Sequence, residues 1–118
     1  MICGLLGEKL SHACVIRRCV ELVGKENLYQ IIDFIHSKNR LAMADISTFE
    51  EGIMNSDLGA DILSTTLSGY TTYSETNSTE PDFELVKELT STTDTPVILE
   101  GRIWLPDEVK KAFELGRI

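Results

Sequence analysis

Three short apolar runs, each ending in a cluster of polar residues, constrain the fold of this chain more than any other feature. They occupy residues 41–46, 61–66 and 95–102, and a segment with helical spacing follows each of them. Runs this short and this continuously apolar are typical of strands buried on both faces of a parallel sheet. The alternation predicts an α/β fold with right-handed crossovers, as in a (β/α) barrel, whose chemistry lies on the loops after the strands.

The length of the chain accounts for only part of such a barrel. The chain has 118 residues, whereas an eight-stranded barrel normally takes about 250. We therefore predict one partial (β/α) barrel, of about three strand–helix units, over residues 26–118. Residues 1–25 form a separate segment, in which residues 10–23 fit either a short helix or an irregular strand.

Charge and hydropathy exclude several classes of partner. The net charge of −8 argues against nucleic acid, because neutralising phosphates requires clustered Lys and Arg. No apolar run approaches the roughly 20 residues of a transmembrane helix, so we expect no membrane partner. The first nine residues lack a basic region and a long apolar core, which predicts no signal peptide and a cytoplasmic location.

The cysteines indicate free thiols. Cys3, Cys14 and Cys19 are odd in number and lie in a chain without a secretory signal, which disfavours a disulfide framework. The possible zinc ligands His12, Cys14, Cys19 and His36 match no standard zinc spacing, so we expect no metal.

Apolar spacing and capping residues predict the helices. Leu28, Ile31, Ile32 and Ile35 form one helical stripe, with Asn27 as a possible N-cap. For the later helices we expect caps and ends from Ser47 or Thr48, Gly59, Asp82 and Pro106. In the last of these helices the expected buried residues are Val109, Ala112, Phe113 and Leu115.

Polar residues at the expected strand ends are the candidates for chemistry. Asp45, Thr65, Thr66 and Glu100 each lie at the C-terminal end of a predicted strand, and the ends of parallel strands gather at one rim. A carboxylate on one strand and another two strands along suit proton transfer at a carbon next to a carbonyl group. A second interpretation also stays open, in which Asp45 caps the following turn or helix.

Gly101 and Arg102 extend this candidate site. A glycine lets the backbone approach a ligand, and an arginine can pair with a carboxylate or clamp a phosphate. The same pair also fits a glycine turn with a structural ion pair, and the residue pattern alone does not choose between these readings.

Four motifs, in order and with appropriate gaps, resemble one enzyme family. They lie at residues 42–48, 64–71, 81–85 and 97–103. Together they closely resemble the bacterial N-acetylmannosamine-6-phosphate 2-epimerases, also called N-acylglucosamine-6-phosphate 2-epimerases, from about Glu26 to Gly116. The resemblance implies a phosphate-binding TIM barrel, of which this chain holds strands five to seven, in an isomerase of sialic acid catabolism without metal or organic cofactor.

The resemblance also implies roles for the candidate residues. The family interconverts N-acetylmannosamine 6-phosphate and N-acetylglucosamine 6-phosphate by removing and returning the proton at carbon 2. By motif, Asp45 resembles the acid that contacts substrate and Glu100 the carboxylate that assists catalysis. Arg102, with Gly101, resembles the substrate-binding neighbour of Glu100. The two strand-end threonines, Thr65 and Thr66, are the other substrate-binding candidates.

Two family features have no counterpart in this sequence. The proton-transferring lysine, in a motif resembling Ile-Lys-Arg, does not occur, and neither does the glycine-rich phosphate loop after strand eight. We therefore expect a shortened reading frame and negligible turnover by the isolated chain. Two alternatives stay open: a non-catalytic half-barrel that self-associates or pairs with another chain, and part of another phosphate-binding barrel enzyme, such as one of the tryptophan pathway.

Overall fold

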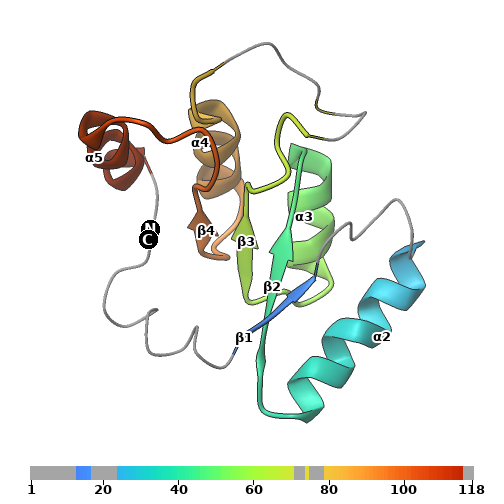
Figure 1. The fold of residues 1–118 in the computed structure, drawn as a ribbon. Helices are drawn as coiled ribbons and strands as arrows, with labels where there is room; N and C mark the ends of the chain where they lie inside the picture. The colour runs from blue at the N-terminus through green and yellow to red at the C-terminus, as the bar shows by residue number, and fades with distance from the viewer. Residues whose placement is uncertain (1–12, 17–23, 71–73, 75–78, 116–118) are drawn as a thin grey trace.

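The structure is a layer of helices packed on a parallel sheet (Figure 1). The computed structural model describes residues 13–16, 24–70, 74 and 79–115. Within these residues the elements, in chain order, are β1 (Ala13–Ile16), α2 (Gly24–Ser37), β2 (Leu41–Asp45), α3 (Phe49–Asp57), β3 (Ile62–Ser64), α4 (Phe83–Thr92), β4 (Val97–Ile98) and α5 (Pro106–Leu115).

The sheet runs in the order β1-β2-β3-β4, with every neighbouring pair parallel. This confirms the predicted α/β class and the three expected strands. It also shows that residues 10–23, which the sequence left undecided, contain a strand. That strand, β1, pairs with β2 from Ala13 opposite Leu41 to Ile16 opposite Ala44. Each helix after β1 therefore connects or follows parallel strands.

One face of the sheet packs against the helices. Alternate strand residues, including Ala44, Leu63 and Val97, lie in one buried cluster with Leu28 of α2 and Leu89 of α4. Because side chains alternate along a strand, Met43, Ile62 and Ile98 point to the opposite face. Neither Ile62 nor Ile98 belongs to the helix-side cluster, although both are buried.

The approach of α3 to α4 depends on a glycine. A Cβ atom on Gly52 would lie 2.5 Å from Leu89 Cδ2 and 3.0 Å from Ile46 Cδ1. Leu89 and Ile46 are fully buried. Gly52 therefore lets the two helices and β2 pack more closely than any larger residue would allow.

The hydrogen bonds and backbone conformation at the helix ends confirm the predicted caps at Thr48, Gly59 and Asp82. Thr48 is the N-cap of α3, since its Oγ1 accepts from Glu51 N at 3.2 Å. Glu51 Oε2 accepts in return from Ser47 N and Ser47 Oγ, as in a capping box. Gly59 follows α3 with φ +102°, the left-handed conformation expected after a helix. Asp82 Oδ1 accepts from Leu85 N at the start of α4, as predicted.

Two expectations about the helices were wrong in detail, the N-cap of α2 and the burial of Phe113. Helix α2 begins at Gly24, so Asn27 lies in its first turn and is not the N-cap. Ile31 lies at the margin of the buried stripe and is exposed. Phe113 is 41% exposed, because it lies about 100° around the helix from Ala112, the buried residue of α5. In addition, Gly116 lies outside the described residues, so its predicted role as the end of α5 is not addressed.

Within the described ranges, every helix is too short or too polar to cross a bilayer.

Candidate active site at the strand ends

Three strands end at the same level of the sheet. Asp45, the last residue of β2, is in register with Ser64, the last residue of β3, and Ser64 is in register with Ile98 of β4. Partners in a parallel ladder point to the same face, which here is the face away from the helices. Glu100 lies two residues after Ile98 and continues this alternation. The sheet therefore brings the two predicted carboxylate positions to one rim.

Glu100 is held by two hydroxyl groups from β3 and the residues after it. Its Oε2 atom accepts from Ser64 Oγ at 3.0 Å and from Thr66 Oγ1 at 2.6 Å. The two hydroxyl oxygens lie 2.6 Å apart. Hydrogen bonds to an ionised carboxylate are stronger than neutral ones. Glu100 is exposed, so its carboxylate is fixed in direction and still open to a ligand.

Thr65 holds the main chain of the same residue. Its hydroxyl accepts from Glu100 N at 3.0 Å and lies 3.3 Å from Glu100 O, to which it donates. The Thr65 side chain is fully buried. These contacts favour a role in positioning Glu100 over direct contact with substrate.

The two residues after Glu100 turn the chain sharply. Gly101 has φ +96° and Arg102 has φ +57°, both in the left-handed region. A Cβ on Gly101 would meet only Thr66 O, at 4.0 Å, so the backbone conformation and not lack of space requires glycine there. A left-handed arginine is uncommon, and such conformations concentrate at functional sites.

Arg102 is available to bind an anion. Its side chain is partly buried, and among the described residues it has no ion-pair or hydrogen-bond partner. A guanidinium group can hold a carboxylate or phosphate through two parallel hydrogen bonds. The turn at Gly101 therefore places an unpaired cation directly after the oriented carboxylate of Glu100.

Asp45 lies deeper than Glu100. It is 3% exposed and ends β2 beside Ser64, so it belongs to the same rim. It does not cap the helix that follows, since Thr48 is the N-cap of α3. The observed burial and register are compatible with the predicted contact to a substrate.

Sequence reasoning missed Ser64. Its hydroxyl donates to Glu100 and lies 2.6 Å from Thr66 Oγ1, and its side chain is fully buried. The available signal was its spacing: Ser64 and Thr66 are two residues apart, so they share a face at the end of the strand. The sequence predicted a strand over residues 61–66, whereas β3 ends at Ser64. The expected end of the strand was therefore at Thr66, and Ser64 was not recognised as a strand-end residue.

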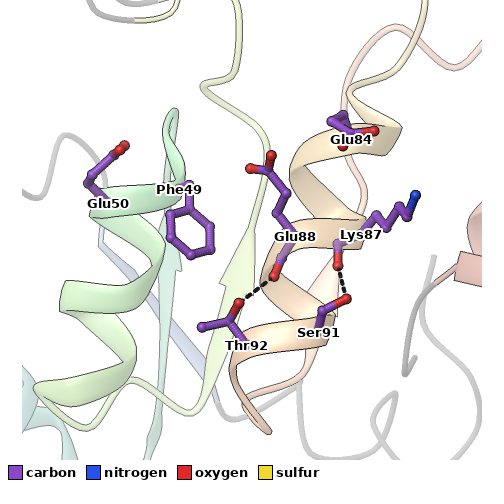
Figure 2. Close-up of a pocket in the computed structure, with 7 residues that line it drawn as sticks. All are labelled: Phe49, Glu50, Glu84, Lys87, Glu88, Ser91 and Thr92. Carbon is purple, nitrogen blue, oxygen red and sulfur yellow. Dashed lines mark hydrogen bonds between the residues drawn. The ribbon is translucent and has the colours of Figure 1, made fainter.

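A separate groove lies between α3 and α4, on the helix side of the molecule (Figure 2). Its volume is about 550 Å³. Figure 2 shows Phe49 between the helices, with Glu50, Glu84 and Glu88 around it. The Ser91 and Thr92 hydroxyls in it bond backbone oxygens of their own helix. None of the strand-end residues lines this groove.

The described residues contain no group of three or more His, Cys, Asp or Glu side chains placed to hold a metal ion. Of the residues considered for zinc, His12 and Cys19 lie outside the described part, and Cys14 lies in β1. His36 instead lies 2.7 Å from Asp61, at the opposite end of the strands.

Fold and site together define a class of protein, a partial (β/α) barrel with polar groups at the carboxyl ends of its strands. A family model described as "Putative N-acetylmannosamine-6-phosphate epimerase" matches residues 15–118. The chain belongs to this family. The match covers α2 to α5 and also the last two residues of β1, upstream of the four sequence motifs.

Individual relatives agree with the family model. A Clostridium perfringens (strain 13) protein named "Putative N-acetylmannosamine-6-phosphate 2-epimerase" is 59% identical over 91 residues, covering 77% of this chain and 41% of that protein. A Staphylococcus aureus (strain Newman) protein of the same name is 38% identical over 95 residues, covering 78% of this chain and 43% of its own length. The chain thus spans about two fifths of the curated relatives it matches.

A solved structure supports the fold. The structure described as the N-acetylmannosamine-6-phosphate 2-epimerase from Clostridium perfringens superposes with a TM-score of 0.72 and 58% sequence identity. The superposition covers 75% of this chain and 38% of that one. The predicted resemblance to a partial epimerase barrel is therefore confirmed.

Proposed function

We propose that this chain carries the carboxylate-bearing rim of an amino-sugar-phosphate 2-epimerase site. The substrates would be N-acetylmannosamine 6-phosphate and N-acetylglucosamine 6-phosphate, which differ in configuration at carbon 2. The observation that carries the proposal is the oriented Glu100, held by Ser64 and Thr66 and followed by Arg102, which has no partner among the described residues.

The chemistry of a 2-epimerase calls for such a rim. The proton on carbon 2 is acidic only while the adjacent carbonyl group is polarised. A base removes this proton, the electron pair of the C–H bond moves toward the carbonyl oxygen, and a proton returns to the other face of carbon 2. The carboxylates that hold the sugar and assist the removal and return of the proton must therefore lie close to carbon 2. Glu100 and Asp45 are the groups that we assign to this task.

Arg102 and the turn at Gly101 would contact the charged part of the substrate. The guanidinium group has no partner among the described residues, so binding an anion would not require breaking an existing ion pair. We assign Thr66 to the rim together with Glu100, whereas Thr65 acts through the Glu100 backbone. A cytoplasmic location stays a prediction of the sequence.

Ligand binding by the purified chain tests this assignment. Titration with N-acetylmannosamine 6-phosphate, followed by amide NMR shifts, should perturb Glu100, Gly101 and Arg102 and leave the groove residues Glu84 and Glu88 unchanged. Arg102→Ala should weaken binding roughly tenfold, the cost of losing one charge-assisted contact. Turnover should be negligible, because the family's lysine motif does not occur in the sequence. Shifts confined to the α3–α4 groove would contradict the proposal.

A further inference from the structure

The loop between β4 and α5, residues 99–105, carries both Glu100 and Arg102. Its start is fixed to the end of β3, because the hydroxyl groups of Ser64 and Thr66 donate to the Glu100 carboxylate. Arg102 lies two residues beyond this fixed point and has φ +57°. The conformation of the turn at Arg102 therefore depends on how the far end of the loop is held.

Glu108 of α5 holds that far end. Its Oε2 atom accepts from Trp104 N at 2.6 Å and from Leu105 N at 2.9 Å, so one carboxylate binds two consecutive backbone donors. Glu108 N in turn donates to Leu105 O at 3.1 Å. A carboxylate in the first turn of a helix also interacts favourably with the helix dipole. The main chain is thereby fixed again at Trp104, with only three residues between this point and Glu100.

The Trp104 side chain joins this loop to a second loop. Its indole Nε1 donates to Thr79 O at 3.1 Å. Thr79 belongs to the connection from β3 to α4, so the bond links the loops that follow two neighbouring strands. Figure 1 shows the β4–α5 loop passing the start of α4, in agreement with this contact.

The chain shortly after Thr79 is itself fixed to the end of β3. Asp82 caps α4 through Leu85 N, and its other carboxylate oxygen accepts from the Ser68 hydroxyl. Ser68 N donates to Thr65 O at 3.0 Å, and Thr65 directly follows β3. Trp104 therefore bonds a segment that has a defined position relative to the strand ends.

We propose that Trp104 is a positioning residue for Arg102. Glu100 and Trp104 fix the chain on either side of the turn, and the indole hydrogen bond ties the second of these points to the β3–α4 loop. The backbone of Arg102 is then confined to one conformation before a ligand arrives, which lowers the entropy that binding an anion would cost. The effect on ligand binding rests on the proposed function, whereas the ordering of the turn does not.

Backbone dynamics without ligand test the ordering. Trp104→Phe keeps an aromatic side chain and removes the N–H donor. In the purified full chain, the NMR order parameters of the amides at residues 101–103 should fall from about 0.85, typical of rigid backbone, toward about 0.6. The control is Tyr29→Phe, which removes the hydroxyl group of an exposed aromatic residue on α2 and should leave these order parameters unchanged.

A double-mutant cycle separates positioning from a merely structural role. Trp104→Phe alone should weaken binding of N-acetylmannosamine 6-phosphate roughly fivefold, as expected for the loss of one net hydrogen bond. In a chain that already carries Arg102→Ala, the same change should have little further effect, because the guanidinium group that Trp104 positions is gone. Circular dichroism of each variant checks that the helices are retained.

Two results would overturn the proposal. The first is a set of order parameters at residues 101–103 that Trp104→Phe leaves unchanged. The second is an equal loss of affinity from Trp104→Phe with and without Arg102→Ala, because the tryptophan would then act without the arginine. A turn that loosens in Trp104→Phe, in a chain that does not bind the sugar phosphate, would contradict the proposed function and still support ordering of the turn by Trp104.

Discussion

Ser64 matters at the scale of single residues because it links the sheet to the candidate catalytic carboxylate. Its hydroxyl is one of two that hold Glu100 Oε2, and it lies in register with Asp45. A hydrogen bond to a charged group contributes about 1.5–3 kcal/mol. Ser64 is thus a positioning residue in the proposed site, acting on Glu100 and not on substrate.

Replacing Ser64 should affect catalysis more than binding. In a chimaera in which the aligned 91 residues of the Clostridium perfringens relative are replaced by this chain's, Ser64→Ala should lower kcat roughly tenfold with little change in KM. Ser91→Ala is the matched control, because Ser91 bonds only Lys87 O of its own helix. Equal kinetics for the two variants would rule out the positioning role.

Asp61 has a structural role at the other end of the strands. Its Oδ2 accepts from Ala42 N at 2.8 Å and lies 2.7 Å from His36 Nε2, so one carboxylate joins α2, β2 and β3. Asp61→Ala should lower the free energy of unfolding by about 1 kcal/mol, since it leaves a backbone donor unpaired in a partly exposed place. Urea unfolding measures this, with the exposed Asp57→Ala as the control. A loss no larger than that of the control would show that the contact is unimportant.

At the scale of secondary-structure elements, the close contact of α3 with α4 depends on Gly52. Alanine normally favours a helix over glycine by about 1 kcal/mol. Here the added methyl group would lie 2.5 Å from Leu89 Cδ2 in a fully buried site. We expect the clash to prevail and Gly52→Ala to destabilise the fold by about 1–2 kcal/mol. The measurement is thermal or urea unfolding, and a gain in stability would contradict the close packing described here.

The start of α3 depends on Thr48. Its hydroxyl accepts from Glu51 N, and Glu51 bonds back to Ser47. Thr48→Ala should therefore cost about 1 kcal/mol in unfolding free energy, while Thr48→Ser should cost little. Thr92→Ala, at an exposed site on α4, serves as the control. Equal losses for Thr48→Ala and Thr48→Ser would mean that the hydroxyl is not the cause.

The sequence predicted the elements well where local signals agree. The apolar runs located β2, β3 and β4, and Gly59 and Asp82 marked helix ends because caps depend on a few neighbouring residues. β1 was undecided, since four residues hold too little periodicity to separate strand from helix. The exposure of Phe113 was also missed, because helical spacing identifies an apolar residue but not whether a neighbouring element covers it.

The sequence predicted the candidate site only in part, because some of its contacts join residues that are distant in the sequence. Strand-end position identified Asp45 and Glu100, and the structure brings their strands into register through Ser64. The roles of Ser64 and Thr65 could not be predicted, because their partners are 36 and 35 residues away and are chosen by strand register. Their contacts depend on tertiary structure alone.

At the scale of the whole molecule, the proposed function requires that the strand-end residues of this chain support proton exchange at carbon 2 of the sugar. The direct test is incorporation of solvent deuterium at carbon 2 of N-acetylmannosamine 6-phosphate by the chimaera described above. We predict that the chimaera exchanges this proton and that Glu100→Gln reduces the rate at least tenfold, as expected for loss of a group that assists proton transfer. Exchange at the same rate with Glu100→Gln would contradict the account.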